Sequence, residues 1–97
     1  MAKDLDSLLI TSELIRAARA LLRWSQGDLA RVSGISVPTI KRLEGVPGIL
    51  AAHSSTVTAL RRALESGGIE FINGNAPGVR LRADAKKKDP GHGPLIS

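Results

Sequence analysis

Lys41 and Arg42 form a pair of adjacent cations with the spacing needed to act on one surface. They follow Pro38 closely, so on a helix of ~3.6 residues per turn all three side chains project from one side. An ammonium or a guanidinium placed there can donate hydrogen bonds to guanine O6 and N7 or to a phosphate, and Val37 or Pro38 can touch a thymine methyl group. The chemistry that this arrangement favours is recognition of a DNA major groove.

The helix that carries this face is predicted over residues 37–44. Ser36 is a favourable N-cap, and a proline is tolerated in the first helical turn because its missing N–H has no intrahelical partner there. Ile40 and Leu43 project from the side opposite the cations, so we expect them to enter a core. Gly45 is expected to end the helix. The helix is therefore predicted to be apolar on one side and cationic on the other.

A second short helix is predicted directly before it, over residues 26–33. Ser25 is a good N-cap, and Asp28 in the third helical position completes a shortened capping box. Gly34 ends this helix, because a left-handed backbone costs little only for glycine. Ala30 supplies the small side chain that two crossed helices need where they approach. Two short helices joined by a glycine turn form the helix-turn-helix pattern, whose second helix can lie in a major groove.

The residues around these two helix starts complete the candidate DNA-binding surface. Phosphates are commonly held by backbone N–H groups and polar side chains at helix N-termini. The predicted base-contacting residues are Val37, Pro38, Lys41 and Arg42. The predicted phosphate-contacting residues are Gln26, Ser36 and Thr39. The alternative interpretation is that the cations form only a solvated face of a small helical domain.

A further helix is predicted before this pair, with Thr11 as its N-cap and Glu13 in its first turn. Its expected apolar side comprises Ile10, Leu14, Ala17, Ala18, Leu21 and Leu22. Its expected outward side comprises Arg16, Arg19 and Arg23. Trp24 follows as the only large aromatic residue of the helical part, and we expect it to fill the core.

The helix predicted after the loop of residues 46–53 has Ser54 or Ser55 as its N-cap and ends at Gly67 and Gly68. Its apolar side comprises Val57, Leu60, Ala63 and Leu64. These residues recur at helical spacing, so this helix is predicted to pack against the others along one face.

Two predicted strands at 69–73 and 79–82 surround a loop at 74–78 and indicate a β-hairpin. The side chains expected to face the helices are Ile69, Phe71, Val79 and Leu81. A lone two-stranded hairpin is marginal in water, so something must cover or extend it. Its open edge could pair with the same strand of a second subunit in a two-fold dimer. The alternative is that the hairpin only caps its own core.

The domain boundaries follow from these elements. We expect a loose N-terminal arm at 1–9, the helix-turn-helix domain at 10–67 and the hairpin at 68–82, which is a candidate dimerisation element. Residues 83–97 combine a lysine triplet at 86–88 with Gly/Pro pairs, and they are predicted to form a disordered basic tail. That tail is either solvated or adds contacts to DNA.

The net charge of +5 is concentrated on the segment that holds the helix pair. Residues 16–62 carry eight Lys or Arg against Asp28 and Glu44, a net of +6. Such a field favours a polyanion through phosphate neutralisation and counterion release. The chain has no cysteine and no apolar run long enough for a membrane span, so we expect a cytoplasmic protein. His53 and His92 stand alone, so we expect no metal site. The sequence has neither a glycine-rich phosphate loop nor a nucleophile elbow, so we expect no cofactor and no enzymatic activity.

The two predicted helices at 26–33 and 37–44 resemble the helix-turn-helix of the Cro/CI (XRE-type) repressors, and the resemblance extends over roughly residues 10–82. The matching positions are Gln26, Ala30, Gly34, Ile40, Leu43, Glu44 and Gly45. The resemblance implies a mainly α fold of four to five helices followed by a short C-terminal β-hairpin. It also implies base contacts from Val37, Pro38, Lys41 and Arg42, and phosphate contacts from Gln26 and Ser36.

Two departures from that family bear on DNA recognition. The Gln or Asn often found at the start of the recognition helix is replaced here by Val37 and Pro38, so adenine readout at that place is in doubt. The loop after Gly45 is apolar where relatives often carry basic residues that grip the backbone. We therefore expect non-specific affinity to rest more on the tail and on four arginines, namely Arg16, Arg19, Arg23 and Arg31.

The resulting expectation is a sequence-specific transcriptional regulator that binds double-stranded DNA as a dimeric repressor. A dimer would present two recognition helices about 34 Å apart to a palindromic site. The alternative is an antitoxin or adaptor, whose main task is to hold a protein partner and which binds a promoter secondarily.

Overall fold

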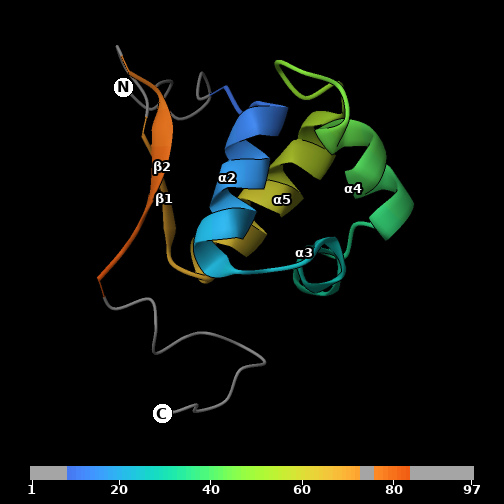
Figure 1. Ribbon diagram of the computed structural model, residues 1–97. Coiled ribbons are helices and arrows are strands. Elements are labelled where there is room, and N and C mark those ends of the chain that lie inside the picture. Colours follow the sequence, from blue (N-terminus) through green and yellow to red (C-terminus); the bar gives the residue numbers. More distant parts are fainter. Residues whose placement is uncertain (1–8, 73–75, 84–97) are drawn as a thin grey trace.

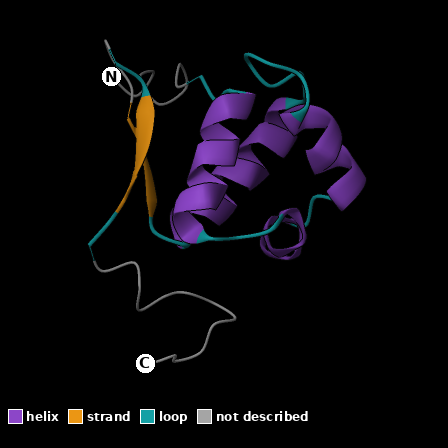
Figure 2. Cartoon of the chain, viewed as in Figure 1, coloured by secondary structure: helices purple, strands orange, loops and turns teal. Residues whose placement is uncertain are grey.

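Four helices gather on one side of the described part of the chain, and a two-stranded hairpin covers their other side (Figures 1 and 2). The computed structural model describes residues 9–72 and 76–83. In chain order the elements are α2 (Ser12–Leu22), α3 (Gln26–Ser33), α4 (Val37–Glu44), α5 (Ser54–Ser66), β1 (Ile69–Ile72) and β2 (Gly78–Leu81). The predicted fold class, mainly helical with a C-terminal hairpin, is confirmed. The predicted arm and tail, with His92, lie almost wholly outside the described residues.

The helices α2, α3 and α4 begin where the sequence predicted, because short polar side chains satisfy free N–H groups of their first turns. The hydroxyl groups of Thr11, Ser25 and Ser36 each accept from the backbone N–H three residues later. The Asp28 carboxylate in turn accepts from the Ser25 N–H at 2.9 Å, which completes the predicted capping box. Gly34 ends α3 with a φ of 81°, the left-handed conformation that was expected of it.

The cap predicted for α5 is wrong by one residue. His53 occupies the N-cap position and its side chain makes no capping hydrogen bond, while Ser54 is already the first residue of the helix. The N–H groups of Thr56 and Val57 reach the His53 carbonyl instead. The first turn of α5 therefore lacks a side-chain partner for its leading N–H groups.

The core lies between the helices and under the hairpin. Its most buried large side chains are Ile15, Leu29, Ile40, Leu60, Leu64 and Ile69. The apolar side predicted for α2 is partly wrong, since Ala17 is exposed and Leu21 is 43 % exposed, while Ile15 is buried with Ala18 and Leu22. Packing against β2 and α4 determines how α2 is rotated about its axis, and the spacing of Leu and Ala alone could not distinguish the two rotations.

Trp24 fills the core as predicted, and its exposed fraction is only 4 %. It packs against the turn after α5, where an added Cβ on Gly67 would lie 2.9 Å from Trp24 Cζ2 and 3.1 Å from Leu22 Cδ1. The backbone at Gly67 is right-handed, with a φ of −84°, so glycine is needed there for its lack of a side chain.

Replacing Gly67 by Ala is therefore expected to lower the free energy of unfolding by about 1–3 kcal/mol, the usual cost of overpacking a core. Denaturant unfolding followed by the fluorescence of Trp24, the only tryptophan, measures this change. Gly78→Ala is the matched control, because nothing lies within 4 Å of a Cβ at that position. Equal stability of the two variants would contradict the close contact with Trp24.

The hairpin faces the helices with the side chains that were predicted to do so. Ile69 is buried, and Phe71, Val79 and Leu81 pack against the core from the same face. The register pairs Ile69 with Leu81 and Phe71 with Val79, and a Glu70–Arg80 ion pair at 2.7 Å lies on the outer face. The strand β2 begins at Gly78 and ends at Leu81, one residue earlier at each end than predicted. The predicted last residue of the first strand, Asn73, lies outside the described residues. Part of the connecting loop lies outside the described residues.

Candidate nucleic-acid interface

The two sides of α4 differ as the sequence predicted. Ile40 and Leu43 are buried in the core, whereas Pro38, Lys41 and Arg42 are exposed. Neither cation forms an ion pair or hydrogen bond with another described residue. Both are consequently available to an external partner, and the helix that carries them lies on the side of the molecule remote from the hairpin (Figure 1).

The predicted flanking residues are less free than the cations. Val37 and Thr39 are half-buried. The Ser36 hydroxyl donates to Thr39 Oγ1 at 3.0 Å and accepts from the Thr39 N–H, so this hydroxyl pair forms the cap of α4. Ser36 itself is exposed at the helix start, beside the N–H groups of the first turn. The local geometry suits a phosphate at this end of α4.

A buried carboxylate at the C-terminal end of α4 determines how that helix is held. Glu44 Oε2 lies 2.8 Å from Arg19 Nε and Glu44 Oε1 lies 2.9 Å from Arg19 Nη2, a bidentate pair between α4 and α2. The Arg19 side chain is 20 % exposed and that of Glu44 5 %. Arg16 adds a hydrogen bond from Nη1 to the Glu44 carbonyl at 2.6 Å. The C-terminal end of the recognition helix is thus fixed to α2 by two arginines.

This arrangement corrects the expectation that Arg19 projects outward and adds to non-specific DNA affinity. Its guanidinium is used inside the protein, where Nη1 also donates to the Trp24 carbonyl at 2.9 Å. Arg31 is exposed but pairs with Asp28 at 3.2 Å. Arg19 is partly buried because it pairs with Glu44, which is distant in the sequence. The helical spacing of the arginines gave no signal for this pairing.

Gln26 belongs to the same network. Its Nε2 donates to Glu44 Oε1 at 2.9 Å, so a side chain at the start of α3 is oriented by a carboxylate at the end of α4. The second amide hydrogen and the amide oxygen remain for another partner. The predicted phosphate contact of Gln26 is compatible with this orientation and stays a prediction.

The environment of Glu44 keeps it ionised. Burial raises the pKa of its carboxyl, but the hydrogen bonds from Arg19 and Gln26, with the positive charges of Arg19 and Arg16, outweigh burial and hold the pKa below its usual range. A carboxylate that accepts several charge-assisted hydrogen bonds favours its charged form. The network is therefore fully formed at neutral pH.

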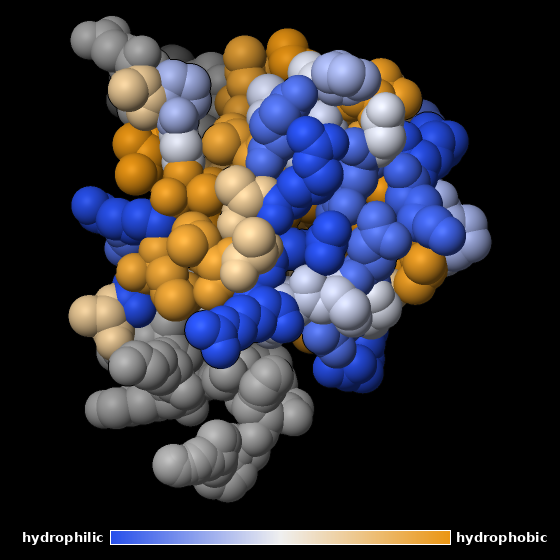
Figure 3. Space-filling view, in the orientation of Figure 1, coloured by the Kyte–Doolittle hydropathy of each residue, from blue (hydrophilic) through white to orange (hydrophobic). Residues whose placement is uncertain are grey.

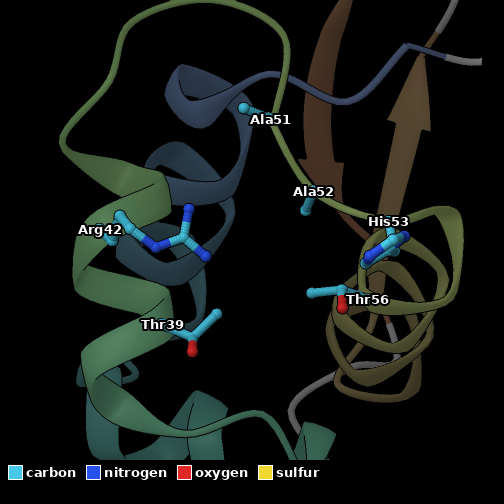
Figure 4. Close-up of a pocket in the computed structure, with 6 residues that line it drawn as sticks. All are labelled: Thr39, Arg42, Ala51, Ala52, His53 and Thr56. Carbon is cyan, nitrogen blue, oxygen red and sulfur yellow. The ribbon is translucent and has the colours of Figure 1, made fainter.

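An open groove of about 510 Å³ adjoins α4 on the side of α5. Its lining residues are Thr39, Arg42, Ala51, Ala52, His53 and Thr56. Figure 4 shows the Arg42 guanidinium extending from α4 into this groove, with Thr56 and His53 on the opposite wall. Because the leading N–H groups of α5 lack a side-chain cap and lie beside this wall, an anion in the groove would meet both Arg42 and a helix N-terminus.

The sequence analysis did not include α5 in the interface. The run Ser54-Ser55-Thr56 at a helix start is a signal that could have suggested it. Hydrophilic side chains gather on the side of α3 and α4, whereas hydrophobic ones gather toward the hairpin and along the edge near the α4–α5 loop (Figure 3). The polar side thus coincides with the exposed face of α4.

This combination of a capped α3, a left-handed glycine turn and an α4 with one buried and one cationic side defines a DNA-binding helix-turn-helix protein. Residues 15–44 match the model of a protein family described as Helix-turn-helix, and this match spans most of α2 and all of α3 and α4. The segment is a helix-turn-helix of the Cro/CI, or XRE, type. This family is defined by DNA binding rather than by catalysis. A search of curated proteins found no match to the chain.

Two further findings concern the described residues alone. No helix among them has the length and apolar character needed to cross a membrane. Likewise, residues 9–72 and 76–83 contain no group of three or more His, Cys, Asp or Glu side chains that could hold a metal ion. His53 contributes to the groove beside α4 without a neighbouring ligand set of this kind.

Proposed function

We propose that this chain is a sequence-specific transcriptional regulator of the cytoplasm, which acts as a dimeric repressor and reads the major groove with α4. The observation that carries this proposal is the free cationic side of α4, held in one orientation by the bidentate Arg19–Glu44 pair at its C-terminal end. A recognition helix that cannot rotate presents the same side chains to every duplex, which sequence discrimination requires.

The roles proposed for individual residues follow their places on this surface. Lys41 and Pro38 are exposed on the outer side of α4, and with Val37 they contact base edges. Arg42 contacts a base edge from the margin next to α5, where its side chain also reaches the groove. The proposed phosphate-contacting residues are Gln26, Ser36 and Thr39.

Selection of bound duplexes from a random-sequence DNA library at ~150 mM salt tests this function, because weak non-specific contacts are suppressed there. The expected result is one enriched palindromic motif. A library that shows no enrichment over its starting composition would contradict sequence-specific recognition. Purification of the chain with a stoichiometric protein partner, and without enrichment, would instead support the antitoxin or adaptor alternative.

A further inference from the structure

Arg23 has a left-handed backbone, with a φ of 61° and a ψ of 35°, and no other non-glycine residue in the described ranges 9–72 and 76–83 has a positive φ. This conformation is disfavoured for L-residues because their Cβ crowds the following carbonyl oxygen, and glycine usually occupies such positions. A strained backbone persists where the surrounding structure determines it, and it is frequent at functional sites. The strain at Arg23 points to a role of its side chain outside the fold.

Two backbone hydrogen bonds impose the conformation. The Arg23 N–H donates to the Ala20 carbonyl at 3.1 Å, and the Trp24 N–H donates to the Arg19 carbonyl at 2.9 Å. This pair of bonds is the Schellman motif, which ends a helix through one left-handed residue. Trp24 is buried in the core directly after the turn, so the backbone on both sides of Arg23 is fixed.

The turn has no need of the Arg23 side chain. Arg23 is exposed, and its guanidinium forms no hydrogen bond or ion pair with another described residue. Contacts within the described protein therefore offset none of the strain. What arginine adds at this position, relative to glycine, is a positive charge at the surface.

That charge lies beside both helices of the helix-turn-helix. Gln26 begins α3 three residues after Arg23, so the Cα atoms of these two residues are within about 11 Å of each other. The Trp24 carbonyl accepts from the same Arg19 guanidinium that holds Glu44, and both hydrogen bonds are 2.9 Å long. The turn between α2 and α3 (Figure 1) is therefore adjacent to the start of α3 and to the C-terminal end of α4.

The other arginines that were expected to attract DNA non-specifically are engaged within the protein. Arg19 and Arg31 form ion pairs, and Arg16 donates to a backbone carbonyl at the end of α4. Of the four expected arginines, Arg23 is the one whose side chain has no partner among the described residues. Its guanidinium keeps all of its donors for an external anion.

We propose that Arg23 contacts a phosphate of the DNA backbone beside the groove that α4 enters, and that the fold holds it at a strained position for this contact. A guanidinium can donate two parallel hydrogen bonds to one phosphate, and release of a condensed counterion favours the contact. The inference rests on DNA binding by this domain, which is the general part of the proposed function. It requires neither the proposed base contacts nor a dimer.

This role links DNA affinity to stability with opposite signs. Glycine at position 23 removes the strain and the charge together. Arg23→Gly is therefore expected to unfold at a higher urea concentration than the unmodified chain and to bind DNA less tightly. A residue that served only the fold would lose stability when replaced.

The experiment measures binding of the unmodified chain, Arg23→Gly and Arg23→Lys to one duplex of random sequence over a range of salt concentrations. Such a duplex reports phosphate contacts, because they carry no sequence information. Arg23→Gly is expected to lose on the order of 3- to 10-fold in affinity at low salt, and its salt slope should fall by about one. Arg23→Lys keeps the charge and should keep the slope. Urea unfolding followed by Trp24 fluorescence gives the stability of each variant.

Arg62→Ala is the matched control, because it removes one exposed cation from α5 instead. Its salt slope is expected to stay that of the unmodified chain. Equal reductions of the slope in Arg23→Gly and Arg62→Ala overturn the proposal, since net charge alone then explains the loss. An unchanged slope in Arg23→Gly, a reduced slope in Arg23→Lys, or a lower unfolding midpoint of Arg23→Gly each overturns it as well.

Failure of the proposed function gives a different result. If selection from the random library enriches no motif, sequence-specific recognition is contradicted, but the salt slopes on the random duplex still decide the role of Arg23. An unmodified chain that binds no duplex at low salt overturns both proposals.

Discussion

Replacing Arg19 by Ala is expected to lower the free energy of unfolding by about 3–5 kcal/mol, the cost of leaving a buried charge without its partner. The two hydrogen bonds from Arg19 satisfy both oxygens of Glu44, whose side chain is only 5 % exposed. Without the guanidinium, the carboxylate keeps only the amide of Gln26 as a side-chain partner. A chain of 97 residues has a total stability of the order of 5–15 kcal/mol, so this variant approaches global unfolding at 37 °C.

Urea unfolding followed by Trp24 fluorescence measures the loss. Arg31→Ala is the matched control, because its ion pair with Asp28 is formed on the exposed surface of α3 and such pairs contribute about 0–1 kcal/mol. If the two alanine variants have the same midpoint, the Arg19–Glu44 pair does not hold the helices together and the argument for a fixed α4 fails.

The same carboxylate predicts a pH dependence. The folded state holds the pKa of Glu44 below the ordinary value of 4.5, so its contribution is fully present above that pH and is lost as the pH falls through the lower, folded pKa. Stability of the unmodified chain should therefore decline as the solution is acidified below about pH 5. Glu44→Gln has no such group, and its unfolding midpoint should start lower and vary less over the same range. Parallel curves for the two proteins would exclude Glu44 as a source of the decline.

The features that the sequence predicted well are local ones. Caps at Thr11, Ser25 and Ser36 depend on a hydroxyl and an N–H three residues apart, and Gly34 depends only on its own backbone. The two sides of α4 were predicted because the core-facing spacing of Ile40 and Leu43 leaves one orientation. These features required no knowledge of what packs against them.

The features that the sequence did not predict depend on distant neighbours. Arg19 and Glu44 are 25 residues apart, and a cation on a helix gives no indication of a partner at that distance. The choice of Ile15 over Leu21 for the core followed from the packing of α2 on other elements. The exposure of Val46 and Ile49 in the loop after α4 could not be read from its apolar sequence, because the pairing of Thr11 with Ile49 determines which side chains of this loop face outward.

Removing the cations of α4 is expected to affect recognition far more than stability. Lys41→Ala and Arg42→Ala should each lose about 10- to 100-fold in preference for the selected duplex over a scrambled one, since a base contact contributes about 1–3 kcal/mol of discrimination. The double variant should lose nearly all preference. Both side chains are exposed and have no partner among the described residues, so the free energy of unfolding should change by less than ~0.5 kcal/mol.

Competition binding with both duplexes, repeated at several salt concentrations, distinguishes the two kinds of DNA contact. Arg62→Ala is the control for charge, because it removes one exposed cation from α5 without altering α4, and it should leave the preference unchanged. A residue that contacts a base alters the ratio of the two affinities. A residue that contacts only a phosphate lowers both affinities equally and reduces the salt slope by about one. If Lys41→Ala or Arg42→Ala lowers both affinities equally, that residue contacts a phosphate and does not contact a base. If both variants do so, neither cation of α4 contributes to sequence discrimination.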